Sequence, residues 1–192
     1  IVGSQVAGTG LALTNAVRCV QIGNAVLSGF TLTNGEAGTF NYPNGGGVNG
    51  SGGGTVTNCV LIGNLSTNGV GGGAYRTTLI NCQIIGNYAN SGGGVCACTL
   101  INCTVVSNTA TSGGGVFGST TYGASFLTGC TIVGNSASSS GGGVNNGGNG
   151  AMNNCIVYYN TAPSGSNYTG IKLNYSCTTP TLSVDLTSIT NA

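Results

Sequence analysis

The chain has 192 residues, of which 40% are hydrophobic and 3% are charged, with three Lys or Arg, two Asp or Glu, no His and a net charge of +1. Disordered polar chains usually carry more net charge and fewer β-branched residues, so this composition predicts an ordered fold with an almost uncharged surface. The low charge argues against nucleic acid and anionic membranes as partners, and no apolar run reaches the roughly 18 residues of a membrane span.

The first 26 residues are apolar and strand-like, with one charged residue, Arg18. They show neither the charges nor the helical pattern with which soluble repeat folds close their ends. We therefore expect residues 1–26 to form an N-terminal coil with an open strand edge.

Residues 27–160 contain a regular repeat: Asn81–Val95 reads NCQIIGNYANSGGGV, and Asn102–Val116, 21 residues later, reads NCTVVSNTATSGGGV. A cysteine column, an asparagine column five residues further on and triple glycines keep this phase, with steps of 21 to 29 residues between cysteine positions. The cysteine column is Cys59, Cys82, Cys103, Cys130 and Cys155, with Phe30 before it and, more weakly, Ser176 after it; the asparagine column is Asn64, Asn87, Asn108, Asn135 and Asn160. A repeat of this length is typical of a solenoid.

Within each repeat, hydrophobic residues alternate with polar ones, and this period of 2 indicates strands. Leu100 and Val105, three positions before and two positions after Cys103, are members of two further apolar columns. Triple glycines and β-branched residues disfavour helix, which excludes ankyrin and tetratricopeptide repeats, and the scaffold of a leucine-rich repeat is absent. The sequence therefore predicts an all-β fold, a parallel β-helix or β-solenoid of about seven coils with 21–29 residues per coil.

The two polar columns have structural interpretations. An inward asparagine at a turn can bond to the same amide in the coils above and below, so we interpret the asparagines as a ladder inside the fold. The inward cysteines are most simply core residues with free thiols, because stacked side chains that point in parallel give poor disulfide torsions. If any thiols pair, Cys19, Cys96, Cys98 and Cys177 are better placed, and the odd total of nine leaves one free or intermolecular.

Residues with catalytic or metal-binding chemistry are almost missing. A zinc site needs converging C-x₂₋₄-C pairs, whereas Cys96 and Cys98 give only C-x-C and the chain has no His. The two acids, Glu36 and Asp185, lie far apart in the chain, while glycoside hydrolysis needs a close carboxylate pair. We expect no enzyme activity, no metal and no cofactor.

Another apolar column stands three positions after the cysteines: Ile62, Ile85, Val106, Val133 and Tyr158. If the alternation continues, this column faces outward and is a candidate self-association stripe, because a contiguous exposed apolar surface usually marks an interface. The alternative is that a turn reverses the alternation and buries it.

Residues 161–192 are expected to form a C-terminal coil and an edge strand within one domain that spans 1–192. Thr178–Ala192 alternates polar and apolar residues with one charge, so it does not read as a cap either. An uncapped, nearly uncharged solenoid should stack head to tail into an open filament.

The segments VLSGFTLTNG, NCxxxGN, GGGV, NNCIVYYN and LNYSCTTP resemble bacterial secreted right-handed parallel β-helix repeat proteins, and are more distantly similar to polymorphic outer membrane proteins of the autotransporter type. The resemblance covers roughly Val26 to Pro180. It implies a right-handed coil and a location outside the cell or at its surface, with any signal peptide and anchor not in this sequence. The sequence departs from the autotransporter pattern because it contains no barrel.

These patterns favour a non-enzymatic structural protein that associates with itself. An adhesin that binds surface glycans is the alternative, with Tyr75, Tyr88, Tyr122, Tyr158, Tyr159 and Tyr168 as stacking surfaces. Ice binding is a third candidate, although the outward Thr31, Thr104 and Thr131 make a threonine rank that other residues interrupt.

Overall fold

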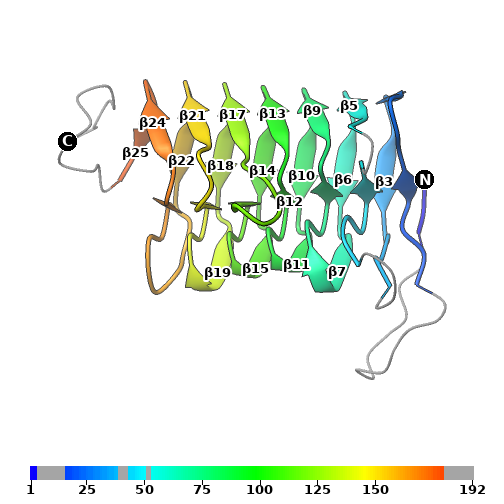
Figure 1. The fold of residues 1–192 in the computed structure, drawn as a ribbon, viewed down its shortest axis with the longest axis horizontal. Helices are drawn as coiled ribbons and strands as arrows, with labels where there is room; N and C mark the ends of the chain where they lie inside the picture. Colours follow the sequence, from blue (N-terminus) through cyan, green and yellow to red (C-terminus); the bar gives the residue numbers. More distant parts are fainter. Residues whose placement is uncertain (4–15, 39–42, 51–52, 180–192) are drawn as a thin grey trace.

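The computed structural model describes residues 1–3, 16–38, 43–50 and 53–179, and every regular element within these ranges is a β-strand. The strands stack along a rod in four parallel sheets (Figure 1). Each coil passes through sheets I, II and III in turn, and four of the coils add a strand of sheet IV. Sheets I, II and III hold seven strands each and sheet IV holds four. Seven strands per sheet correspond to about six full turns between the first layer and the last, so the predicted all-β solenoid is confirmed, with a coil number close to seven.

The strands are short, as tight coils require. Sheet I contains β1 (Val20–Gln21), β4 (Val48–Asn49), β8 (Ala74–Tyr75), β12 (Val95–Cys96), β16 (Val116–Gly118), β20 (Val144–Asn146) and β23 (Tyr168–Thr169). Sheet II contains β2 (Val26–Ser28), β5 (Thr55–Thr57), β9 (Thr78–Ile80), β13 (Thr99–Ile101), β17 (Phe126–Thr128), β21 (Ala151–Asn153) and β24 (Lys172–Asn174). Sheet III contains β3 (Thr31–Thr33), β6 (Val60–Ile62), β10 (Gln83–Ile85), β14 (Thr104–Val106), β18 (Thr131–Val133), β22 (Ile156–Tyr158) and β25 (Cys177–Thr178), and sheet IV contains β7 (Leu65–Val70), β11 (Tyr88–Ser91), β15 (Thr109–Ser112) and β19 (Ser136–Ser140).

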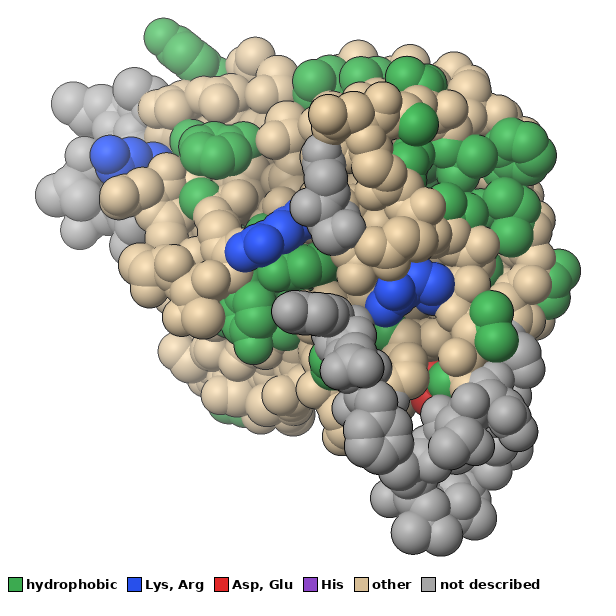
Figure 2. Space-filling model, turned by 45° about the vertical axis from the view of Figure 1, so that its right-hand side comes forward, with side chains coloured by type: hydrophobic (Ala, Val, Ile, Leu, Met, Phe, Trp, Pro, Cys, Tyr) green, Lys and Arg blue, Asp and Glu red, His purple; other side chains and the backbone are tan. Residues whose placement is uncertain are grey.

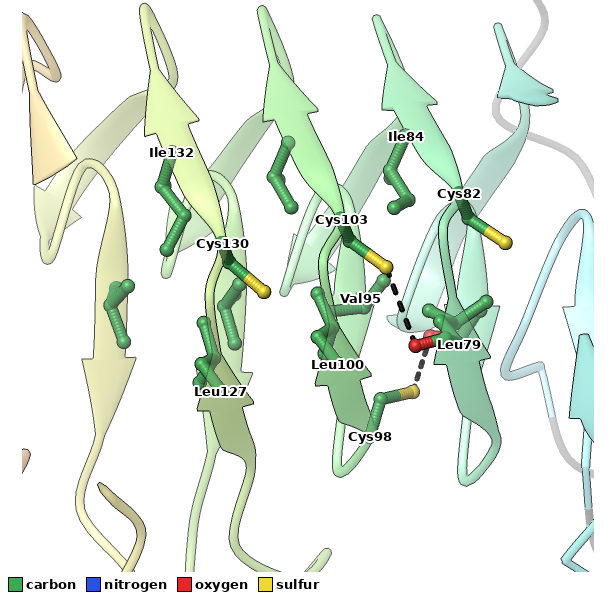
Figure 3. Packing of buried hydrophobic residues seen from close by; sticks show 14 of the residues in the cluster. Leu79, Cys82, Ile84, Val95, Cys98, Leu100, Cys103, Leu127, Cys130 and Ile132 are labelled. Carbon is green, nitrogen blue, oxygen red and sulfur yellow. Dashed lines mark hydrogen bonds between the residues drawn. The ribbon is translucent and has the colours of Figure 1, made fainter. Parts of the chain in front are cut away.

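The core consists of columns in which each residue packs on its counterpart in the next coil. Leu79 pairs with Leu100 across β9 and β13, and Ile84 pairs with Val105 across β10 and β14. These side chains are fully buried, and Figure 3 shows the leucines of sheet II and the isoleucines of sheet III with the cysteines between them. The apolar columns read from the sequence are therefore the inward faces of sheets II and III.

The glycine triplets form the corner between sheets IV and I, where a side chain would collide with the next coil. The first glycine of each triplet has a positive φ, as in Gly92 at 66°. A Cβ on the second, Gly93, would collide with the carbonyl oxygen of Thr109 in the next coil. The triplets are therefore required by the backbone conformation and by coil-to-coil contact.

The ends of the rod differ in part from the sequence expectation. Ile1–Gly3 pairs with β3, where the amino group of Ile1 donates to the carbonyl oxygen of Thr31. Phe30, which the repeat pattern placed in the inward cysteine column, is 46% exposed in the first coil. Residues 4–15, and the edge strand expected after residue 179, lie outside the described residues.

Candidate functional site

The asparagine column forms a continuous hydrogen-bonded ladder at the corner that follows sheet III. The Oδ1 atom of Asn108 accepts two hydrogen bonds from Asn87, one from the backbone N–H at 2.8 Å and one from the side-chain Nδ2 at 2.9 Å. The Nδ2 atom of Asn108 donates to the carbonyl oxygen of Ile84 at 2.9 Å and to Oδ1 of Asn135 at 2.9 Å. All five asparagines of the column are buried, so these bonds satisfy amides that would otherwise be costly to remove from water.

Both ends of this ladder are closed within the chain. At the N-terminal end, Oδ1 of Asn64 accepts the backbone N–H of Gly35 at 2.9 Å. At the C-terminal end, Asn167 supplies an additional rung: its Oδ1 accepts Nδ2 of Asn160 at 3.2 Å, and its own Nδ2 donates to the carbonyl oxygen of Thr179. The repeat period did not predict Asn167, because it is only seven residues from Asn160. In the next coil, the backbone of Asn167 stands at the position that Gly143 has in its own coil.

The cysteine column lies at the corner between sheets II and III and is almost fully buried. The thiol of Cys103 donates to the carbonyl oxygen of Leu79 in the preceding coil at 3.3 Å (Figure 3). It also lies 3.3 Å from the carbonyl oxygen of Ile101, to which it can donate. A hydrogen bond with the thiol of Cys130, together with burial, raises the pKa of Cys103 to about 11. Ser176 continues the column, where its Oγ accepts the backbone N–H of Cys155 at 3.1 Å.

All nine cysteines are free thiols, including the four outside the column that the sequence marked as better placed to pair. Seven are buried, and the two partly exposed ones, Cys19 and Cys177, lie in the first and last coils. Burial also raises the pKa of the thiols of Cys96 and Cys98. A protonated, buried thiol is a poor nucleophile and metal ligand, so most of these cysteines act as small apolar residues.

The outer apolar column, Ile62, Ile85, Val106, Val133 and Tyr158, faces outward from sheet III. Its members pair in register from β6 to β22. Ile62 is exposed and the other four are partly exposed, while the middle residue of each strand is buried. The alternative that a turn buries this column is wrong for this fold, because the alternation continues unbroken through each strand.

A second apolar cluster, which the sequence reading missed, covers the outer face of sheet I. Tyr75, Cys96 and Phe117 stack on neighbouring strands, and Tyr122 reaches them from the segment after β16, with its ring centroid 6.4 Å from that of Tyr75. The guanidinium of Arg76 lies 5.1 Å from the centroid of the Tyr75 ring and donates to the carbonyl oxygen of Tyr122. Figure 2 shows Lys and Arg side chains beside hydrophobic groups on one face of the molecule.

No group of three or more His, Cys, Asp or Glu that could hold a metal ion occurs in the described part of the chain. Glu36 is buried in the first coil, and Asp185 lies outside the described residues. The described ranges also contain no helix that is long and apolar enough to cross a membrane.

Comparison with protein-family models, with curated proteins and with solved structures finds no match to this chain. The resemblance to secreted β-helix repeat proteins therefore rests on the repeat pattern and on the parallel β-solenoid that the structure shows.

Proposed function

We propose that this protein is a non-enzymatic structural β-solenoid of the extracellular space or cell surface, whose copies join head to tail into a filament or stalk. The observation that carries the proposal is where the exposed apolar side chains lie. Among the described residues, eight of the eleven large exposed apolar side chains lie at the N-terminal end (Ile1, Val2, Val17, Val26 and Phe30) or in the last two coils (Ile156, Tyr159 and Tyr175), and Ile62, Tyr88 and Phe126 lie between them.

The most exposed of the large apolar side chains among the described residues also lie at the two ends. Val2 and Val26 are 71% and 70% exposed, and Tyr159 and Tyr175 are 81% and 67% exposed. Exposed apolar surface that gathers in one place usually marks an interface, so apolar surface at both ends of a rod favours contact between rods. Because the two ends of the rod carry different side chains, a contact between the head of one copy and the tail of the next is heterologous and builds an open chain of copies.

The backbone and the charges support the same association. β2 is the first strand of sheet II, and among the described strands it pairs with β5 alone. Its other edge can therefore accept a strand from another copy. A net charge of +1 provides almost no repulsion between copies.

Two alternatives have less support. For a glycan-binding adhesin, Tyr88 and Tyr159 are exposed, but Tyr75 and Tyr168 are buried and cannot stack on a sugar. For ice binding, Thr55, Thr78 and Thr99 stack in register on sheet II, but Phe126 ends this rank.

Electron microscopy of the untagged protein at neutral pH tests the head-to-tail proposal. The wild type should form thin filaments, and Val26→Lys should leave short single rods, because it places a charge on the first strand of sheet II, beside the proposed end-to-end contact. Phe126→Lys is the matched control, since Phe126 lies in the same outward column of sheet II but in the middle of the rod. Dispersed rods of the wild type at high concentration would overturn the proposal and favour the adhesin.

A further inference from the structure

We propose that the outer face of sheet III is a second contact, through which two filaments of this protein pair side by side. The inference rests on the proposed head-to-tail assembly and adds a lateral partner to it. That partner is a second copy of the same sheet, which the outer apolar column contacts.

The chemistry of the face favours an uncharged partner. Every outward position from β3 to β25 is Thr, Val, Ile, Gln, Tyr or Cys, so none of the described residues on this face carries a charge at neutral pH. Two such faces can approach without burying an unpaired charge, which is the usual obstacle to burying protein surface. The described Lys and Arg residues lie in or beside sheets I and II.

The regular spacing of the side chains on this face favours a second copy of the same face as its partner. The outer apolar column places one side chain per coil, and neighbouring coils are separated by about 4.8 Å. The strands lie side by side with little rotation from one coil to the next (Figure 1), and their register does not shift from β3 to β25. Side chains of one such face can enter the gaps between side chains of an identical face along its whole length. Flat sheets of many strands are typically stabilised by stacking of this kind.

The area of the face explains why pairing should follow filament formation. Seven strands of about three residues cover about 300 Å² on one molecule, by the usual strand spacing and rise. A stable interface between two proteins buries about 800 Å² on each partner, so two single rods should not form a stable lateral dimer. In a filament each further copy adds its face to the same contact, and the second and later contacts form at high effective concentration.

The test compares three proteins by electron microscopy: the wild type, Val106→Lys and Ile101→Lys. Val106 lies in the middle of the outer apolar column, and Ile101 is an outward residue of the same coil on sheet II. We expect wild-type filaments to be paired along most of their length, Val106→Lys filaments to be single, and Ile101→Lys filaments to pair like the wild type. Val133→Glu serves as a second variant of the column if Val106→Lys does not fold.

The outcomes separate the two proposals. Wild-type filaments that remain single, or pairing that persists in both column variants, would overturn the lateral contact and leave head-to-tail assembly intact. Loss of pairing in Ile101→Lys as well as in Val106→Lys would also overturn it, because the effect would not be specific to sheet III. A wild type that forms no filaments would overturn head-to-tail assembly and the lateral contact with it.

Discussion

Replacing Asn108 with Ala tests whether the asparagine ladder is a main source of stability. The substitution removes the acceptor of two buried donors, the backbone N–H and the Nδ2 group of Asn87, which bond to Oδ1 at 2.8 and 2.9 Å. Each unsatisfied buried donor costs about 1–3 kcal/mol, so the free energy of unfolding should fall by about 2–6 kcal/mol. This is a large part of the roughly 5–15 kcal/mol that holds a typical domain folded.

The measurement is urea denaturation followed by far-UV circular dichroism. Asn102→Gly is the matched control, because Asn102 is an exposed corner asparagine with a φ of 52°, and Gly129 occupies the same corner one coil later. We expect the control to change the free energy of unfolding by less than about 1 kcal/mol. An equal loss in the two variants, or a loss below about 1 kcal/mol for Asn108→Ala, would refute the interpretation of the ladder as a stabilising network.

The remaining predictions concern the thiols and the glycines. Stability should fall as the pH rises from about 9 towards 11. The pKa of Cys103 is raised from 9.0 to about 11 in the folded state, so the unfolded state binds fewer protons than the folded state in this range. This thiol alone lowers the free energy of unfolding by about 1.4 kcal/mol per pH unit, which urea denaturation across that range would measure. Gly93→Ala should lower the free energy of unfolding by more than about 2 kcal/mol, because its Cβ meets the backbone of the next coil. Gly86→Ser, where a Cβ meets open space at a φ of 58°, should lower it by about 1 kcal/mol, and similar losses for both glycine variants in thermal melts would contradict this reasoning. An alkylating reagent should label only Cys19 and Cys177 in the native protein and all nine cysteines after unfolding, and mass spectrometry that finds the buried column labelled in the native state would contradict its burial.

Much of the fold could be predicted because each coil repeats the same local pattern. The alternation around Cys103 places Leu100 and Val105 inside, and the structure buries both. The spacing of Asn108 from Cys103 likewise places the asparagine at a corner, where its side chain bonds to its counterparts in neighbouring coils and to nearby backbone groups. In a parallel stack every coil contacts two near copies of itself, so a local rule that holds in one coil is enforced along the whole rod.

Other features could not be read from the repeat, because they depend on residues that break it. Tyr122 belongs to an insertion after β16, and only the folded chain shows that it packs on Tyr75 from a coil two layers earlier. Asn167 closes the asparagine ladder from a position that the period does not predict. Contacts of this kind depend on how an irregular segment folds back onto the stack, which local alternation does not specify.

The sequence by itself determined the parallel solenoid, its inward columns and its nearly uncharged surface, since period, spacing and composition are local properties. Only the tertiary structure decided that the outer apolar column faces outward and is at least partly exposed, and that the most exposed of the large apolar side chains lie at the two ends of the rod. Exposure depends on whether another segment of the chain covers a residue. That is a property of the whole assembled stack, so a sequence pattern can suggest it but cannot decide it.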